Sequence, residues 1–259
     1  MTNDISMFNM MLTVATLVLT FFIFYFLKIN LFKEAVISAG RMTIQLFLVG
    51  IYLSWIFRIN HPFINIAYIL FMAAVANYTL IKSSGLRLNL FNYTFPALLI
   101  GLTTVLVYFM FFVYIPTPIY DAKYLIPIAG MLLGNSMTRA IVTFERFYNS
   151  IRDDRDGFAS FIIMGGTVRE SIIPYLRTAY KAGISPSLAN MATIGIVFLP
   201  GMMTGQILGG SPPIVAIKYQ ITISLAILAA TELSTLLMIL FSLKKGFDSY
   251  GFLNTNIFK

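Results

Sequence analysis

Apolar stretches of about spanning length recur along the whole of this 259-residue chain, separated by short charged gaps. A helix needs about 20 apolar residues to cross the hydrocarbon core of a bilayer. Only 11% of the residues are charged, whereas a soluble domain carries about 25%. A compact water-soluble fold could not hide this much apolar surface, because part of any such fold must face water. The pattern therefore predicts a polytopic membrane protein.

We expect an all-α fold with about seven transmembrane helices, organised as a single transmembrane domain over residues 1–259. Two spans need a basic residue inside them, Arg41 at the start of the second and Arg139 in the fifth, whose long side chains can extend to the interface. The sixth apolar stretch has 36 uncharged residues, so one helix followed by broken backbone is expected there. The predicted spans are residues 8–27, 42–57, 62–81, 88–115, 124–144, 182–198 and 219–243.

Basic residues are distributed unevenly between the two sides of this predicted bundle. With seven spans, 15 of the 18 Lys and Arg residues fall on one side, and only Arg58, Lys123 and Lys218 fall on the other. Cytoplasmic loops carry the excess of basic residues. This predicts an N-terminus outside the cell and a C-terminus in the cytoplasm, with the chain in the plasma or inner membrane. Because the net charge of +8 lies in the gaps between spans, we expect lipid contacts and no nucleic-acid partner.

The most unusual stretch is LPGMMTGQ, residues 199–206, inside the long sixth apolar region. Proline and glycine at membrane depth free backbone carbonyls, which only protein or a water-filled cavity can satisfy. Broken helices of this kind often mark transport sites. Met202, Met203 and Gln206 are therefore candidates for lining a substrate path. The two thioethers are soft metal ligands, although methionine at a helix interface more often serves as flexible packing.

Two further polar residues lie inside predicted spans. Glu232 is the one acid near the middle of a span, and such a carboxyl usually faces the bundle interior or a pathway. Two interpretations stay open for it: contact with an ion on its path, or a protonated carboxyl that hydrogen-bonds between helices. Asn135 follows glycines at positions 130 and 134, whose spacing permits close helix approach. Packing is the simpler interpretation of that segment, and a polar path remains open for Asn135.

Residues 145–181 form the only sizeable hydrophilic segment, between spans five and six, and hold 11 of the 28 charged residues. Thr167 has capping-box spacing to Glu170, and Pro174 is expected to kink the helix that follows, giving a short helix, a bend and a second helix. The segment either lies on the lipid headgroups or docks onto a soluble partner as a coupling helix. We favour docking, through Gly165, Gly166, Thr167, Arg169, Glu170 and Arg177.

No motif of catalysis occurs in the chain. The phosphate-cradling pattern G-x4-G-K-[ST] is missing, so the chain has no P-loop of its own. With no Cys and one His, thiolate sites and His-cluster metal sites are excluded. We expect a non-enzymatic chain without a cofactor and assign no metal ligands.

Five segments carry a resemblance to the FetB/YbbM family of membrane permeases. They are residues 41–46 (RMTIQL), 131–137 (MLLGNSM), 190–195 (NMATIG), 199–208 (LPGMMTGQIL) and 218–221 (KYQI). The resemblance spans nearly the whole chain, and PGMMTGQIL is a long and specific match. Members of that family are permeases of ABC transporters associated with iron export, with plant relatives linked to aluminium tolerance.

The resemblance implies a membrane-spanning permease subunit that exports a metal ion such as iron. A separate cytoplasmic subunit would bind ATP and Mg and supply the energy. Seven helices are few for an alternating-access pathway, and symmetric dimers are the commonest oligomers, so we expect a homodimer. The alternative is a stand-alone secondary transporter energised by protons through Glu232. Residues 156–159 (DGFA) match the acidic-alanine coupling motif of other ABC permeases only loosely.

Overall fold

The computed structural model describes residues 6–113 and 117–259, and those residues form helices and no strands. The elements, in chain order, are α1 (Met7–Val14), α2 (Thr16–Phe26), α3 (Phe32–Ile59), α4 (Pro62–Ser83), η1 (Leu88–Leu90), α5 (Phe91–Tyr108), η2 (Phe109–Val113), α6 (Ala122–Asp153), α7 (Arg155–Ile163), α8 (Val168–Thr193), α9 (Gly201–Leu208), α10 (Pro213–Gly246) and η3 (Thr255–Ile257). The prediction of an all-helical fold is confirmed.

Within the described residues, six helical segments are long and apolar enough to cross a membrane. They coincide with six of the seven predicted spans, although residues 114 and 115 of the fourth predicted span lie outside the described residues. Arg41 and Arg139 lie inside their helices, as those spans required. The six segments are Phe8–Phe26, Phe32–Ile59, Pro62–Ser83, Leu88–Val113, Ala122–Asp153 and Pro213–Gly246.

The sixth predicted span is built differently from the others. Residues 182–193 form the second half of α8, whose first half belongs to the charged segment, so seven crossings remain a prediction. The helix ends at Thr193, five residues before the expected end at 198. Gly195 then takes a left-handed conformation with φ +82°, which favours glycine, and its amide donates to the Phe198 carbonyl at 2.9 Å. The predicted break in this region is confirmed.

The separate second helix expected after Pro174 is wrong, because α8 continues through this proline and through Pro186 as one helix. A proline removes the amide that would bond to the carbonyl four residues earlier, which is that of Glu170. Glu170 lies in the exposed first turn of α8, where water can satisfy the carbonyl. The free-energy cost of one missing hydrogen bond at this exposed position is too small to end the helix.

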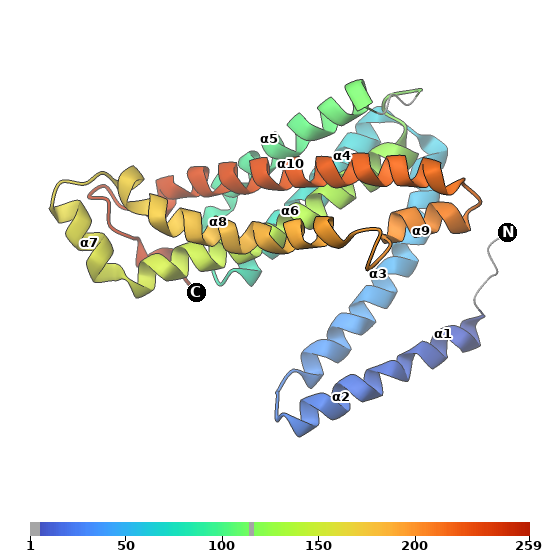
Figure 1. Ribbon diagram of the computed structural model, residues 1–259, viewed down its shortest axis with the longest axis horizontal. Helices are drawn as coiled ribbons and strands as arrows, with labels where there is room; N and C mark the ends of the chain where they lie inside the picture. Colours follow the sequence, from blue (N-terminus) through green and yellow to red (C-terminus); the bar gives the residue numbers. More distant parts are fainter. Residues whose placement is uncertain (1–5, 114–116) are drawn as a thin grey trace.

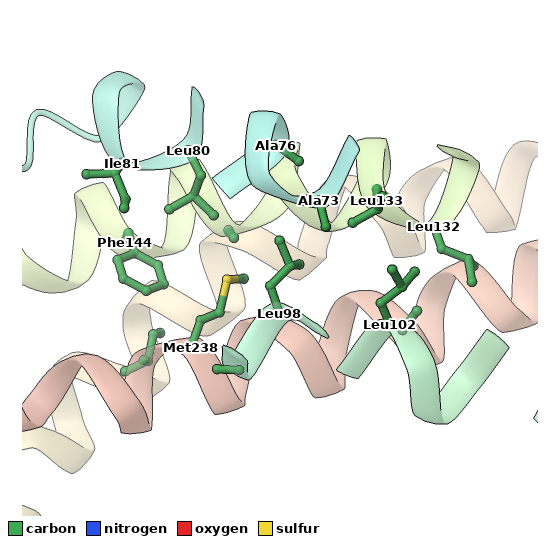
Figure 2. Packing of buried hydrophobic residues seen from close by; sticks show 14 of the residues in the cluster. Ala73, Ala76, Leu80, Ile81, Leu98, Leu102, Leu132, Leu133, Phe144 and Met238 are labelled. Carbon is green, nitrogen blue, oxygen red and sulfur yellow. The ribbon is translucent and has the colours of Figure 1, made fainter. Parts of the chain in front are cut away.

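Helices α4, α5, α6 and α10 surround one apolar core, and Figure 2 shows side chains from all four converging in it. Without a hydrophobic force between helices in lipid, association depends on close packing. Small residues permit that packing: Ala73, Ala97 and Ala230 are fully buried. Gly101 of α5 lies so close to α10 that a Cβ atom would stand 2.6 Å from the Cα of Ser234. These contacts hold α10 against α5 along the bundle.

The N-terminal helices stand apart from this bundle, as Figure 1 shows for α1, α2 and most of α3. Only the end of α3 is anchored: Ile56 is buried against Ala122 and Ile126, and the hydroxyl of Tyr52 contacts that of Tyr68. Most of the other described side chains of α1 to α3 are exposed, and many of them are large and apolar. In a membrane this surface is covered by lipid or by another protein.

Helix α1 begins at the end of the molecule where α9 lies in Figure 1, and the C-terminus lies toward the opposite end, near α7. An odd number of crossings produces this arrangement. We predict that a thiol at Ser6→Cys reacts with an impermeant maleimide in intact cells, whereas one at Asn256→Cys reacts only after permeabilisation. The chain has no natural cysteine to interfere. Labelling of both thiols from one side would contradict the seven-span arrangement.

Candidate substrate pathway and coupling surface

The five predicted path residues lie in four different cavities and do not converge on one site. Glu232 lines a small cavity of about 10 Å³, and Asn135 lines one of about 170 Å³. Met203 lines the largest, about 530 Å³. Met202 and Gln206 line a fourth cavity of about 340 Å³ between α6, α9 and α10. Met202 and Met203 diverge because neighbouring residues of a helix point about 100° apart, so the two thioethers do not share a site.

Three of these cavities lie next to one another in a row along α6, α8 and α10 and share lining residues. The 530 Å³ and 170 Å³ cavities share lining residues, including Met191, Gln220 and Ser224. Arg139 lines both the 170 Å³ cavity and the small cavity at Glu232. The broken backbone after α8 contributes Ile194, Pro200 and neighbouring residues to the two larger cavities. The row therefore passes from the α8–α9 break to the polar cluster at Glu232.

Polar side chains recur along this row, and several of their atoms have no partner. The amide nitrogen of Gln220 donates to the hydroxyl of Ser224 at 2.9 Å, while its buried carbonyl oxygen has no hydrogen bond. The Nε atom of Arg139 is also buried without a partner. Buried polar atoms are normally hydrogen-bonded, so unpaired ones in a cavity indicate room for water or a ligand.

Glu232 is half-buried in a tight polar constriction between α6, α8 and α10. Its backbone carbonyl accepts a hydrogen bond of 2.8 Å from the hydroxyl of Tyr180. Gly183 brings α8 against α6, since a Cβ atom there would lie 3.3 Å from the Arg139 carbonyl. Arg139 lines the same small cavity as Glu232, yet among the described residues no ion pair within 4.0 Å joins them. The constriction thus holds one acid and one base.

The sequence did not lead us to predict that Arg139 lines two of these cavities. A basic residue inside an apolar run was taken to extend to the interface, because nothing local indicates what the neighbouring helices contribute. The available signal was its position, four residues after Asn135 and therefore on the same face of α6. For the described residues, no cluster of three or more His, Asp or Glu side chains could hold a metal.

The predicted capping box is present at the start of α8. The Thr167 hydroxyl accepts from the Glu170 amide at 3.3 Å, and the Glu170 carboxylate accepts from the Thr167 amide at 2.9 Å. The Thr167 hydroxyl and amide lower the pKa of the Glu170 carboxyl. The cap is thus complete above the ordinary pKa of a glutamate and is lost as the pH falls through the lowered value. Gly165, with φ +96°, turns the chain into this helix.

Helices α7 and α8 form a hairpin at the end of the molecule where the C-terminus lies (Figure 1). The Tyr175 hydroxyl donates to the Asp154 carboxylate at 2.6 Å, and burial together with this bond raises the Tyr175 pKa to about 12. The Phe158 ring contacts that of Phe247, with centroids 5.5 Å apart. These contacts fix the hairpin to the body of the protein and leave its turn free.

The turn of the hairpin presents an apolar tip that sequence reasoning did not single out. Ile163 and Met164 are 76% and 79% exposed. Gly166 packs against the ring of Phe161 and has no space for a side chain. The predicted coupling residues Arg169, Glu170 and Arg177 are all exposed on α8 beside this tip. Exposed apolar side chains flanked by charges are typical of a surface that binds another protein or the membrane.

Comparison with known proteins agrees with this architecture. A "UPF0014 membrane protein YjkA" of Bacillus subtilis is 32% identical over 230 residues, which is 89% of this chain and 91% of that protein. The "Probable iron export permease protein FetB" of Escherichia coli is 29% identical over 225 residues, 86% of this chain and 85% of its own. The "Protein ALUMINUM SENSITIVE 3" of Arabidopsis thaliana is 31% identical over 216 residues, 82% and 77% of the two chains.

No solved structure matches the chain. The model of the uncharacterised protein family UPF0014 matches residues 7–247. The predicted resemblance to the iron-export permeases and their plant relatives is confirmed by these matches. The chain therefore belongs to the UPF0014 family of membrane proteins.

Proposed function

We propose that this chain is the permease subunit of an ABC transporter, in which a separate cytoplasmic subunit binds ATP and Mg and drives export of a metal ion such as iron. The main support is the row of cavities between α6, α8 and α10, which contains polar side chains inside a membrane-spanning bundle. Polar residues at membrane depth are costly and usually mark a pathway. The name of the Escherichia coli relative, a probable iron export permease protein, is the basis for the proposed cargo and direction.

The exposed hairpin α7–α8 is the proposed docking surface for the ATP-binding subunit. Its tip at Ile163 and Met164 would enter a groove of that subunit, and Arg169 and Arg177 would contact its rim. Support comes from the exposure of all four residues beside an end of the bundle. The chain itself has no P-loop, so ATP hydrolysis requires such a partner.

Two copies of the chain are proposed to assemble in the plasma or inner membrane, with the hairpins on the cytoplasmic side. The exposed faces of α8 and α10 next to the largest cavity, and the uncovered helices α1 to α3, are the surfaces available for this contact. In this assembly the row of cavities with Glu232, Asn135 and Met203 would line the path of the cargo between the two copies. Met202 and Gln206, the other two path candidates, line a separate cavity outside this row. A cavity open on one side is completed when a second copy covers it.

The alternative is a secondary transporter that uses protons through Glu232, whose half-buried carboxyl shares a cavity with Arg139. Reconstitution separates the two proposals. We expect the purified chain to co-purify with an ATP-binding subunit, two of each per complex by mass, and to move iron in proteoliposomes only with ATP and that subunit. Uptake driven by a pH gradient with the chain alone would favour the secondary transporter and contradict the ABC proposal.

A further inference from the structure

The two larger cavities of the row adjoin each other and differ in chemistry. The 530 Å³ cavity is lined mostly by aliphatic and thioether side chains such as Met191, Leu199, Met203 and Leu225. The 170 Å³ cavity carries Arg139 with the amides of Asn135 and Asn190 and the hydroxyl of Ser187. Gln220 and Ser224 line both. A molecule that occupied both cavities would meet an apolar environment at one end and hydrogen-bond donors at the other.

Arg139 is the one charged residue among those that line either cavity. Its guanidinium is always protonated and offers a planar set of donors that matches carboxylate and phosphate oxygens. Neither an ion pair nor a hydrogen bond of its side chain occurs among the described residues, and Nε is buried. Neither cavity has an Asp or Glu in its lining, and Glu232, the acid that shares the small neighbouring cavity with Arg139, forms no ion pair with it within 4.0 Å among the described residues. A bare cation would be repelled here, whereas an anion would be attracted.

We propose that these two cavities bind an amphipathic organic anion, with its oxyanion on Arg139 and its apolar body in the larger cavity. The volume of the larger cavity lies in the range of small-molecule sites, which are mostly apolar with a few placed polar groups. This inference rests on the proposed transport function: an exported metal would pass as a complex with such an acid. An aromatic carboxylic acid and an anionic membrane lipid share this chemistry.

Binding of two probes to the purified full-length chain in phosphatidylcholine nanodiscs tests the proposal. Salicylate carries a carboxylate and an aromatic body, and salicylamide has the same shape without the charge. We expect Arg139→Gln to weaken salicylate binding at least tenfold and to change salicylamide binding less than twofold, because only the first loses a charge-assisted hydrogen bond. Arg139→Lys keeps the charge and should retain intermediate affinity. Arg58→Gln, at an exposed arginine that lines neither cavity, is the matched control.

A second variant tests the apolar half of the site independently. Leu225 lines the large cavity and is 55% exposed, so Leu225→Trp should fill part of the cavity without disturbing the core. It is expected to weaken both probes by a similar factor. If salicylate binds as well to Arg139→Gln as to the unchanged chain, or if Fe²⁺ alone binds and salicylate does not, the anion site is overturned.

Two further arms identify the source of the anion. Displacement of salicylate by phosphatidylglycerol in the nanodisc, seen with the unchanged chain, would assign the site to a lipid. Tighter binding of ferric salicylate than of salicylate, without displacement by the lipid, would assign it to a metal complex. Both results support the proposed chemistry. The binding assay needs no ATP-binding subunit. If salicylate does not bind but the chain still co-purifies with an ATP-binding subunit, the anion site is wrong and the ABC proposal is unaffected.

Discussion

The Glu232→Gln variant is expected to lose at least nine-tenths of its transport activity while it still assembles with the ATP-binding subunit. Glu232 and Arg139 line one small cavity, and no other described acid lines it. Removing the negative charge leaves the charge of Arg139 uncompensated in a low-dielectric environment, where electrostatic effects are strong. If the cargo is a free cation, it is then repelled by the guanidinium of Arg139. If the cargo is an anion, it dissociates from Arg139 more slowly. Turnover falls in both cases.

Transport in proteoliposomes, measured beside expression and co-purification, checks this expectation. Glutamine nearly preserves the shape of glutamate and can both donate and accept a hydrogen bond. A purely structural carboxyl at this position would therefore tolerate the change, and near-normal transport would return Glu232 to a packing role. Glu145→Gln makes the same chemical change on the exposed surface of α6 and should transport normally. The direction of the change in KM also identifies the cargo, since an anion should bind more tightly to Glu232→Gln.

Local patterns in the sequence were sufficient to predict much of this fold. Six spans follow from runs of apolar residues, because burial in lipid depends on composition over about 20 neighbouring positions. The capping box between Thr167 and Glu170 requires only two side chains at a fixed spacing. The chain break was predicted in the same way from Pro200 and Gly201, whose backbone preferences are intrinsic, although α8 already ends at Thr193.

The site could not be predicted to the same extent, since each cavity is built by three helices that are distant in sequence. Met202 and Met203 are neighbours in sequence but line different cavities. The association of Arg139 with Glu232 depends on α6 and α10 lying side by side under Tyr180 and Gly183 of α8. No periodicity in a single helix reports such a contact. The separate second helix expected after Pro174 does not form for a related reason, because the position of the lost hydrogen bond in an exposed turn decides its cost.

The Met164→Glu variant is expected to bind the ATP-binding subunit roughly thirtyfold more weakly and to lose ATP-driven transport. Met164 is 79% exposed in the isolated chain, so a charge there costs little before docking. Burying that charge in an apolar groove without a partner is costly, and an anchor residue at an interface contributes about 2 kcal/mol or more. Co-purification, the affinity for the ATP-binding subunit and the ATPase activity stimulated by transport would each be measured. Met164→Leu keeps the apolar tip and should retain all three.

The choice of control decides whether this result reports on docking or on folding. Ile172 lies on the same hairpin but is only 3% exposed and belongs to the core, so a change there would destabilise the bundle as well. Arg169→Glu reverses a charge beside the tip and should weaken association by a smaller factor, because exposed charges at a rim contribute mainly to the rate of encounter. Arg87→Glu makes the same reversal at an exposed residue outside the hairpin. Equal losses in Arg169→Glu and Arg87→Glu, with full binding by Met164→Glu, would remove the hairpin from the docking surface.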